Sequence, residues 1–443
     1  MARKEELARM WEHTLDYLYN QRPAFEREGG KGYKPGLDTA IALDKLYKEP
    51  HRRFRIIHIA GTNGKGSTAH LLASCLQQCG YRVGLFTSPH LVDFRERIRV
   101  NGRKISRNYV MNWVSEYQKQ DMGDMEPSFF ELTTAMAFDF FAWRRVNIAI
   151  IETGLGGRLD STNIITPELS IITNIGMEHQ QFLGNTIEEI ALEKAGIIKH
   201  GCPVIIGRAE GSVRKVFEDE AKRLYAEIKF AQDKPEVLKS QRSNGMLKLT
   251  TKNFGTVNCQ LTGSYQVENA NTVLTTLSLL KRLKYRIKED AIHEGFAHVI
   301  ENTGLMGRWM KIGDKPITIC DSAHNPAAME LAMRQLRNEH YNQLHIVMGF
   351  MADKDVSAML NMIPADAKFY FTEAHNKRTL PVKKLMQLAS RAHIEGKAYE
   401  NVVDALNAAR ENASEKDMIY VGGSMYVLAE LLTAIGYDDH LES

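Results

Sequence analysis

IIHIAGTNGKGST, residues 56–68, is the stretch of sequence that best indicates the fold of this chain. A β-branched, apolar run of the kind that forms a buried strand leads into a loop with three glycines, and a helix-like segment, AHLLASCLQQCG, follows. Glycines let the backbone wrap around a phosphate, and the amides at a helix N-terminus direct a positive dipole towards it. Lysine adds a full positive charge, and a serine hydroxyl can bind phosphate or magnesium. The stretch therefore predicts a phosphate-binding loop made of Thr62, Asn63, Gly64, Lys65, Gly66 and Ser67.

The spacing within this loop departs from the common GxxxxGK[ST] form. Gly61 lies three residues before Gly64, and Gly66 separates the lysine from the serine. A glycine-rich turn unrelated to phosphate is therefore the alternative interpretation. The strand-like run before the loop and the helix-like segment after it favour the phosphate loop.

The same order of elements recurs along the chain. Short runs, most of them apolar throughout, end in glycine-rich or polar loops that lead into helix-like segments. These runs are residues 54–60, 82–86, 147–152, 169–175, 203–207, 316–321, 344–350, 368–373 and 418–423. Strands that alternate with helices predict an α/β fold with a mainly parallel sheet, in which ligands bind beyond the carboxyl ends of the strands. The loops after these runs are therefore where we expect the chemistry.

The length of 443 residues suggests two or three domains. The segment ENTGLMGRW follows a helix-like stretch and holds two glycines, so we expect a boundary there, with domains at residues 1–302 and 303–443. Residues 209–262 combine a charged helix with short alternating strands, which predicts a β-hairpin insertion or an extension of the first sheet. The opening helix, about residues 4–20, has an apolar stripe that packing explains, formed by Leu7, Met10, Trp11, Leu15 and Leu18.

The composition favours a soluble globular protein, with 44% hydrophobic and 25% charged residues. No uncharged apolar run approaches the roughly 20 residues that span a bilayer, and the N-terminus is charged, so we expect a cytoplasmic protein without membrane contact. Five cysteines without a CxxC pair are too few and too scattered for a disulfide scaffold, and burial explains Cys75 and Cys79. A net charge of +3 without a basic stripe argues against a nucleic-acid binder and is compatible with a small anionic substrate. No long apolar surface helix calls for a partner, so we expect a monomer.

Further candidate residues follow the predicted strands. Glu152 ends the run 147–152, where a carboxylate can reach the magnesium ion of a bound nucleotide, although a structural carboxylate is the alternative. In ICDSAHNPAAM, Asn and Pro suit the start of a helix, which leaves Asp321 and His324 free to face a ligand. Asp321 could bind a ribose hydroxyl, as an acidic residue at a strand end often does. His179 and Lys194 would not be selected from their local sequence alone.

The ordered set of motifs AGTNGKGS, FTSPHL, FRERIRVNG, SFFE, ETGLGGRLDSTN, EKAGIIK, GRW and DSAHNP closely resembles folylpolyglutamate synthases and the bifunctional dihydrofolate/folylpolyglutamate synthases. These enzymes belong to the Mur ligase superfamily. The resemblance implies a P-loop-type, mainly parallel ATPase domain and a smaller Rossmann-like α/β domain. It also implies an ATP-dependent ligase in which phosphorylation of a carboxylate gives an acyl phosphate that the amino group of L-glutamate attacks. The implied acceptors are dihydropteroate and the γ-carboxylate of reduced folates.

The resemblance also assigns roles to individual residues. The implied cofactors are ATP and Mg²⁺, with two magnesium sites. The implied catalytic residues are Lys65, Lys194 in a carbamylated form, and His324. The implied metal ligands are Ser67, Ser88, Glu152 and His179. Adenine and ribose contacts would come from Asn269, Arg308 and Asp321. The pteridine end would contact Lys34, Pro35, Gly36, Leu37, Ser128, Phe129, Phe130, Leu159, Asp160 and Ser161. The incoming glutamate would lie near His324 and Ser424. One departure is Ser322, where the family usually has glycine.

Two other functions compete with this one. A muramyl ligase, which adds amino acids to a UDP-linked precursor, carries a separate N-terminal domain, but only 60 residues precede Gly61. Its loop also usually reads GKT rather than GKGS. A P-loop nucleotide switch without ligase activity would need switch segments or a Walker-B aspartate, whereas the strand here ends in Glu152. Glutamate-dependent ATP turnover separates the ligase from the switch.

Overall fold

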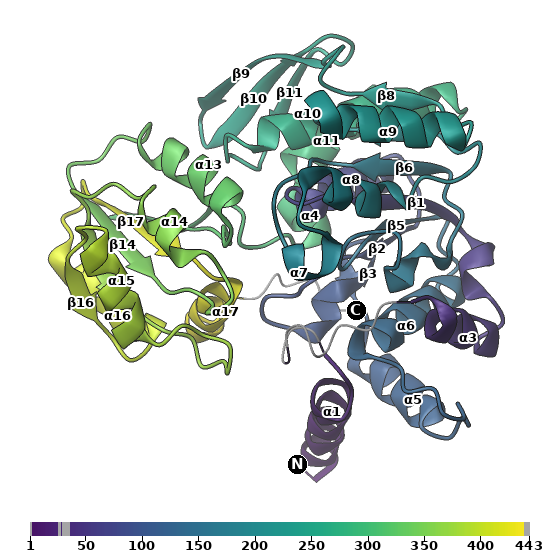
Figure 1. Ribbon diagram of the computed structural model, residues 1–443, viewed down its shortest axis with the longest axis horizontal. Coiled ribbons are helices and arrows are strands. Elements are labelled where there is room, and N and C mark those ends of the chain that lie inside the picture. The colour runs from purple at the N-terminus through teal and green to yellow at the C-terminus, as the bar shows by residue number, and fades with distance from the viewer. Residues whose placement is uncertain (1, 25–27, 29–35, 438–443) are drawn as a thin grey trace.

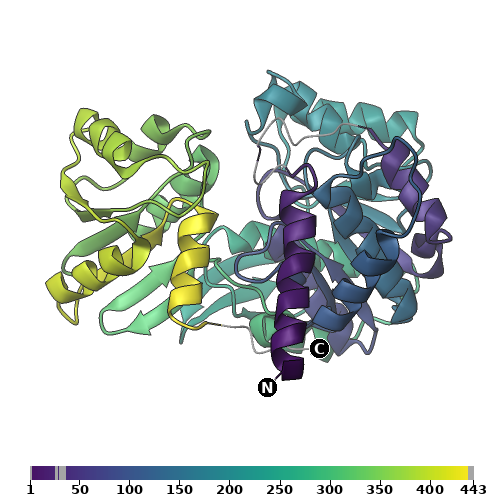
Figure 2. The ribbon, with the colours of Figure 1, turned by 90° about the horizontal axis from the view of Figure 1, so that it is seen from below.

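The computed structural model describes residues 2–24, 28 and 36–437, and in this part of the chain the strands form three sheets. A large, mainly parallel sheet and a small three-stranded sheet belong to the N-terminal part, and a second mainly parallel sheet belongs to the C-terminal part. The two parts lie side by side (Figure 1). The view from below shows the C-terminal helix α17 (Met425–Ala434) on the side of its part that faces the N-terminal helix α1 (Ala2–Asn20) (Figure 2).

The large sheet has eight strands in the order β4-β3-β2-β5-β1-β6-β7-β8. In chain order they are β1 (Arg55–Ala60), β2 (Val83–Phe86), β3 (Ile98–Val100), β4 (Arg103–Lys104), β5 (Ile148–Glu152), β6 (Leu169–Ile172), β7 (Val204–Ile206) and β8 (Ile228–Phe230). All pairings are parallel except the short antiparallel edge formed by β2, β3 and β4. The central strand β1 pairs with β5 and β6, and its last five residues are buried. A strand that is buried on both faces requires the continuous apolar run that the sequence has there.

Helices cover both faces of the large sheet. The helices of the N-terminal part, besides α1, are α3 (Asp38–Leu46), α4 (Lys65–Gln78), α5 (Arg107–Tyr117), α6 (Phe129–Trp143), α7 (Gln180–Leu183), α8 (Ile187–Ala195), α9 (Gly211–Arg223), α10 (Gln266–Arg282), α11 (Glu289–Ala297) and α12 (Val299–Thr303). Alternate residues of β1 point to different cores, because side chains alternate along a strand. Ile57 and Ile59 pack with α4, α10 and α11, whereas Ile56 packs with the core around α5 and α6.

The C-terminal part has a six-stranded sheet in the order β12-β13-β17-β14-β15-β16. Its strands are β12 (Met310–Asp314), β13 (Ile317–Cys320), β14 (Leu344–Met348), β15 (Lys368–Phe371), β16 (Gly396–Ala398) and β17 (Met418–Gly422), and only the edge pair β12–β13 is antiparallel. Besides α17, its helices are α13 (Pro326–Leu336), α14 (Val356–Leu360), α15 (Val382–Arg391) and α16 (Val402–Asn412). All nine runs that were expected to be strands contain one, and the predicted α/β fold with mainly parallel sheets is confirmed.

The segment 209–262 contains both of the features that the sequence left as alternatives. Its helix α9 leads into β8, which does extend the large sheet, as one of the two alternatives predicted. The remaining strands β9 (Val237–Ser243), β10 (Met246–Thr251) and β11 (Thr256–Cys259) form a separate antiparallel sheet of two consecutive hairpins, so the predicted hairpin is present as well. Leu247, Leu249 and Val257 are buried against α10 and α11, so the small sheet covers the helices that support the glycine loop.

The stripe on α1 packs only in part. Trp11 and Leu18 are buried, with 9% and 0% of their surface exposed, whereas Leu7 and Met10 are 40% and 50% exposed. The expectation that the whole stripe is covered is therefore wrong for the first turns of the helix.

Cys75 and Cys79 are buried and unpaired, as expected. Among the described residues, no helix is long and apolar enough to cross a membrane.

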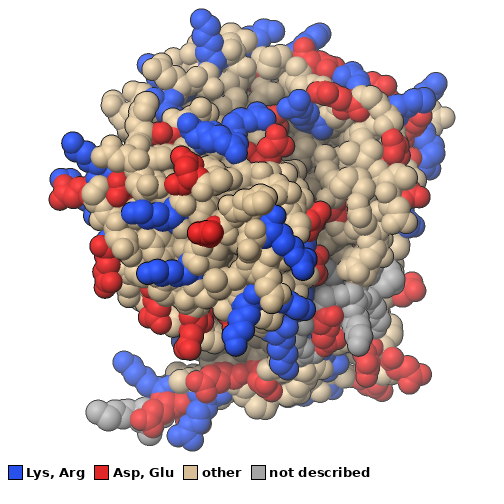
Figure 3. Space-filling model, turned by 60° about the vertical axis from the view of Figure 1, so that its left-hand side comes forward, with Lys and Arg blue, Asp and Glu red and all other residues tan. Residues whose placement is uncertain are grey.

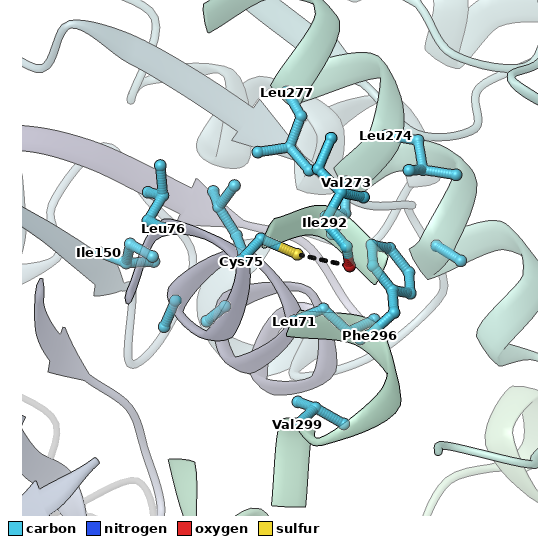
Figure 4. Close-up of a cluster of buried hydrophobic side chains, with 14 of the residues drawn as sticks. Leu71, Cys75, Leu76, Ile150, Val273, Leu274, Leu277, Ile292, Phe296 and Val299 are labelled. Atoms are coloured by element: carbon cyan, nitrogen blue, oxygen red, sulfur yellow. Dashed lines mark hydrogen bonds between the residues drawn. The ribbon is translucent and has the colours of Figure 1, made fainter. Parts of the chain in front are cut away.

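Helix α4 is held in place by apolar contacts along its whole length. Leu71, Cys75 and Leu76 pack against α10, α11 and the large sheet, and the Cys75 thiol lies 3.9 Å from the carbonyl oxygen of Ile292 (Figure 4). The Sγ–carbonyl contact is weak, so packing provides most of the stabilisation. Because α4 begins directly after the glycine loop, this core fixes the direction in which the helix N-terminus points.

Replacing Phe296 by alanine is expected to lower the free energy of unfolding by about 3–5 kcal/mol. Phe296 is fully buried in the core that supports α4, so the substitution leaves a cavity there. Denaturant unfolding measures the change. The matched control is Leu7→Ala on the exposed part of α1, which is expected to change the value by less than about 0.5 kcal/mol. Equal effects of the two substitutions would contradict the assignment of the core.

Candidate active site

The carboxyl ends of the central strands of both large sheets face one region of the molecule, which contains two adjoining cavities. The glycine-loop cavity is lined by the loop residues 62–67 together with Glu152, Asn269, Arg308 and Asp321. The apolar cavity lies beside it and is lined by residues that include Phe130, Leu159, Met351 and Tyr426. Six residues line both cavities: Ser88, Pro89, Gly154, His179, His324 and Met425. A ligand in one cavity can therefore meet a ligand in the other at these residues.

The glycine loop takes a shape that requires glycine at two positions. Gly61 and Gly64 have φ angles of 146° and 84°, which side-chain-bearing residues rarely adopt. The loop is fastened to the segment after β6: the amide of Thr62 donates to the Asn174 carbonyl oxygen (2.9 Å), and the amide of Asn63 donates to the Asn174 side chain (3.0 Å). The loop is therefore preorganised rather than open to many conformations.

Lys65 is the first residue of α4. Its ammonium group donates to the carbonyl oxygens of Gly61 (2.9 Å) and Thr62 (3.1 Å), so it folds back over the loop. The amides of the first turn of α4 lack partners within the helix and point along its axis. A positive charge and free amides at one place form a site for a phosphate group. The sequence predicted this arrangement from local spacing, and the structure brings its parts together.

Asn269 lies next to the loop. It sits on α10, and its side chain occupies the space that a Cβ on Gly64 would need. Its amide donates to Gln266 (2.8 Å), whose own amide donates to the hydroxyl of Ser67 (3.1 Å). The start of α10 thus carries a hydrogen-bonded chain that reaches the first turn of α4.

Glu152 ends β5 and is buried beside the start of α4. Its carboxylate accepts a hydrogen bond from the amide of Ser88 (3.2 Å) and lies 3.7 Å from the position of a Cβ on Gly66. Burial raises the pKa of Glu152 to about 7, although Lys65 and Arg308 oppose this. A carboxylate with nearby serine hydroxyls is a donor set that suits Mg²⁺, which prefers oxygen ligands and usually keeps several positions for water or phosphate. Among the described residues, no group of three or more His, Cys, Asp and Glu side chains is arranged so that it could hold a metal ion, so a metal ion here would also need the hydroxyls and ligand oxygens.

Lys194 lies on α8 and is buried against the loop from the other side. Its ammonium group donates to the carbonyl oxygen of Gly61 (3.0 Å), the same oxygen that Lys65 contacts. Burial, together with the charge of Lys65, lowers the pKa of Lys194 to about 7. An amine with this pKa is neutral in a large fraction of molecules at neutral pH, which makes it available as a nucleophile or base.

Glu178 and Lys354 are site residues that the sequence analysis missed. The Glu178 carboxylate lies 3.5 Å from Lys354 Nζ, 3.5 Å from His324 Nε2 and 3.6 Å from His179 Nε2. Burial would raise the pKa of Glu178, but His324, His179 and Lys354 outweigh it and hold the pKa well below its usual value. Glu178 comes from the N-terminal part, whereas His324 and Lys354 come from the C-terminal part, so this cluster joins the two. Both missed residues lie in loops at the carboxyl ends of strands, which is the signal that could have identified them.

His179 has a backbone φ of 53° and precedes the short helix α7. Burial lowers the pKa of His179 to about 4, with Lys354, Lys194 and Lys65 acting in the same direction and Glu178 against it. The imidazole is therefore neutral at physiological pH, which is the form that binds metal ions.

Asp321 is placed in the glycine-loop cavity, but protein groups satisfy its oxygens. It accepts hydrogen bonds from the Tyr265 hydroxyl (2.6 Å) and from the amides of Trp309 (2.7 Å) and Ala323 (2.9 Å). Burial raises the pKa of Asp321. Tyr265 directly precedes α10, so its hydrogen bond to Asp321 also joins the N-terminal part of the chain to the C-terminal part.

Ser322 stands where the resemblance leads us to expect glycine. Its hydroxyl accepts a hydrogen bond from Arg308, and its backbone is not left-handed, so a serine fits there without strain.

The remaining predicted residues divide between the apolar cavity and other places. Ser128, Phe130, Leu159, Asp160, Ser161 and Ser424 line the apolar cavity. Ser128 also caps α6, and Asp160 accepts from the amide of Leu155 (2.8 Å), so both shape the wall. Phe129 points into the core instead, where it stacks on Tyr19 at 5.1 Å. Gly36 and Leu37 precede α3 and do not line the cavity, and Lys34 and Pro35 lie outside the described residues.

Comparison with known proteins identifies two domains in the chain. Residues 59–277 match the Mur ligase middle domain, and residues 307–425 match the Mur ligase glutamate ligase domain. The chain is 32% identical over 416 residues to the dihydrofolate synthase/folylpolyglutamate synthase of Bacillus subtilis, with 90% of this chain and 95% of that protein covered. A probable bifunctional folylpolyglutamate synthase/dihydropteroate synthase of Haloferax volcanii is 34% identical over 413 residues, which are 90% of this chain, but the chain spans only about half (48%) of that longer protein.

Solved structures resemble the chain over nearly its whole length. The Mycobacterium tuberculosis folylpolyglutamate synthase complexed with ADP has a TM-score of 0.87 and 30% identity, with 98% of this chain and 99% of that chain covered. Escherichia coli FolC in complex with DHPP and ADP has a TM-score of 0.81 and 27% identity, with 96% and 97% covered. The predicted Mur-ligase-type architecture is therefore confirmed.

Proposed function

Because the chain belongs to the Mur ligase family and, within it, to the dihydrofolate synthase/folylpolyglutamate synthases, which are ATP-dependent ligases, we propose that it joins L-glutamate to dihydropteroate and to the γ-carboxylate of reduced folates. One observation carries the proposal: a cavity built around a phosphate loop opens into an apolar cavity at Ser88, His179 and His324. A ligase that activates a carboxylate with ATP needs this connection, since the nucleotide and the flat aromatic acceptor must meet at one carboxylate.

The reaction takes place in two transfers. An oxygen of the acceptor carboxylate attacks the γ-phosphorus of ATP, the bond from that phosphorus to the bridging oxygen breaks, and ADP leaves. The neutral amino group of glutamate then attacks the carbonyl carbon of the acyl phosphate, phosphate leaves with the electrons of the C–O bond, and the nitrogen loses its proton. Several anions crowd the site in both transfers, so positive charge and helix dipole must offset them. Lys65 and the first turn of α4 supply both.

The residues around the loop fit the proposed metal ions. Ser67, Ser88 and Glu152 would hold a first Mg²⁺, and His179 with a carbamylated Lys194 would hold a second. Support comes from the buried Glu152 carboxylate beside α4, from the neutral His179 and from the lowered pKa of Lys194, which exposes a neutral amine to carbon dioxide. Magnesium bound there would neutralise charge on the phosphate oxygens. Lys194 itself would gain two carboxylate-type oxygens in place of a positive charge.

The other predicted residues keep their proposed roles. Asn269 and Arg308 would contact the nucleotide. Asp321 would act mainly by orienting Tyr265 and the Trp309 amide, because these groups already occupy its oxygens. His324 and Ser424 would face the incoming glutamate, which would enter beside the Glu178–Lys354 pair. We also propose a boundary between the two domains at residues 302 and 303, a monomeric state and a cytoplasmic location. Light scattering of the purified chain measures whether it is a monomer.

The proposed function is tested by phosphate release from Mg-ATP in the presence of L-glutamate. We expect turnover with dihydropteroate and with tetrahydrofolate, and each product should be heavier by one glutamyl unit. Turnover with only one acceptor would restrict the function to glutamate addition to that acceptor. Turnover with a UDP-linked cell-wall precursor and with neither folate acceptor would contradict the proposal. Turnover that does not depend on glutamate would favour a nucleotide switch.

A further inference from the structure

A third cavity lies beside the apolar cavity, between the end of α1, the loop after β2 and the start of α17. We call it the side cavity. It shares Pro89, Met425 and Tyr426 with the apolar cavity. Pro89 and Met425 also line the glycine-loop cavity, so all three spaces meet at these two residues. A ligand whose end reaches the phosphate loop can therefore extend into either of the other two cavities.

The wall of the side cavity is suited to an anion that also carries amide groups. Among the described residues that line it are Arg97 and Lys377 but no Asp or Glu. Two amide side chains, Asn20 and Asn376, add hydrogen-bonding groups. His90 also lines it, and since burial lowers its pKa well below the usual value, this imidazole adds no charge. The wall thus combines positive charge with neutral polar groups.

The two cations have different environments. Arg97 is buried at the base, where its Nε donates to His90 Nδ1 (2.7 Å) and its guanidinium lies 5.0 Å from the ring centroid of Phe129. Lys377 is exposed at the rim, and no carboxylate of the described part of the chain pairs with it. His375, which also lines the cavity, bonds to the carboxylate of Glu430 through its backbone amide (2.5 Å) and its ring (3.1 Å). Figure 3 shows several Lys and Arg side chains close together beside the hollow between the two halves of the molecule.

We propose that the side cavity receives the γ-linked oligoglutamate tail of an acceptor that already carries several glutamates, with Lys377 and Arg97 facing its α-carboxylates. This inference rests on the proposed function. The carboxylate that reacts must always reach the phosphate loop, whereas each addition lengthens the tail. If the ring system stays in the apolar cavity and the reacting carboxylate stays at the phosphate loop, the distance between them is fixed. The added glutamate units must then bulge out of the direct path between the ring system and that carboxylate. The side cavity opens at that point, and each added unit brings one carboxylate and one amide, the two kinds of group that its wall suits.

The test compares Lys377→Glu with the unchanged enzyme on three acceptors: dihydropteroate, tetrahydrofolate with one glutamate, and tetrahydrofolate with three γ-linked glutamates. The substitution replaces the attraction between Lys377 and the tail carboxylates by repulsion. We therefore expect the ratio of kcat/KM for the triglutamate to kcat/KM for dihydropteroate to fall about tenfold. The products, analysed by mass spectrometry, should also become shorter.

Two further arms separate the possible failures. Lys383→Glu, an exposed lysine on α15 that lines none of the three cavities, is the matched control and should leave the ratio unchanged. The effect of Lys377→Glu should shrink at high salt, because an exposed charge is screened. An unchanged ratio with normal turnover of dihydropteroate would overturn the tail site alone. Absence of turnover with every acceptor in the unchanged enzyme would overturn the proposed function.

Discussion

Replacing Lys65 by methionine is expected to lower kcat/KM for ATP-dependent glutamate addition by about 10³-fold. The variant keeps a side chain of similar length but removes the charge that lies over the loop and that would meet the phosphates during transfer. A steady-state assay with saturating glutamate and dihydropteroate measures the change.

The substitution has a second consequence within the site. Because the charge of Lys65 contributes to the low pKa of Lys194, the pKa of Lys194 should rise in the variant. Lys248→Met, an exposed lysine on β10, is the matched control and should retain full activity. Retention of activity within a few-fold of the unchanged enzyme, in a Lys65→Met protein that unfolds normally, would exclude the phosphate-loop role.

Lys194→Ala is expected to lower kcat by about 100-fold if the carbamylated lysine binds a metal ion, since loss of such a group weakens both the metal and the charge it offsets. Added bicarbonate should not restore the variant. Lys199→Ala is the matched control, since Lys199 is a partly buried lysine nearby that lines neither of the two main cavities. Normal turnover of Lys194→Ala would contradict the role.

The same hypothesis predicts a pH dependence with a definite sign. Carbamylation needs the neutral amine, and burial places the pKa of Lys194 near 7, so the neutral fraction grows as the pH rises from 6 to 8. Enzyme depleted of carbon dioxide should therefore regain more activity at pH 8 than at pH 6, at one dissolved carbon dioxide concentration. Equal recovery of activity at both pH values would contradict the carbamylation of Lys194.

The sequence predicted the buried strands well because a strand with helices on both faces must be apolar throughout. The strands that it missed are short or polar and lie mostly at edges. Arg103–Lys104 (β4) contains two charged residues, and Val237–Ser243 (β9) has only its first residue buried. Their pairing depends on a neighbouring strand rather than on their own composition, so no local pattern indicates them.

The candidate site was predictable where one local segment forms it. The glycine loop and its helix are such a segment. Glu178 and Lys354 were missed because they are 176 residues apart and meet only in the folded chain. Phe129 shows the opposite problem, since the motif SFFE does not say which of its two aromatic rings faces the cavity. The capping of α6 by Ser128 fixes this, and it directs Phe129 inwards and Phe130 to the cavity.

Gln335 is one of several residues whose hydrogen bonds join the two domains. Its side chain accepts from the amide of Ser264 (2.5 Å) and donates to the carbonyl oxygen of Thr262 (3.3 Å), and so joins α13 to the segment before α10. A rotation that preserves both bonds has its axis beside this helix. Helix α13 borders the glycine-loop cavity through Ala328 and Leu331 but contributes nothing to the apolar cavity. A rotation of this kind would separate the walls of the apolar cavity further than those of the glycine-loop cavity, and so would widen the access route for the acceptor more than that for the nucleotide.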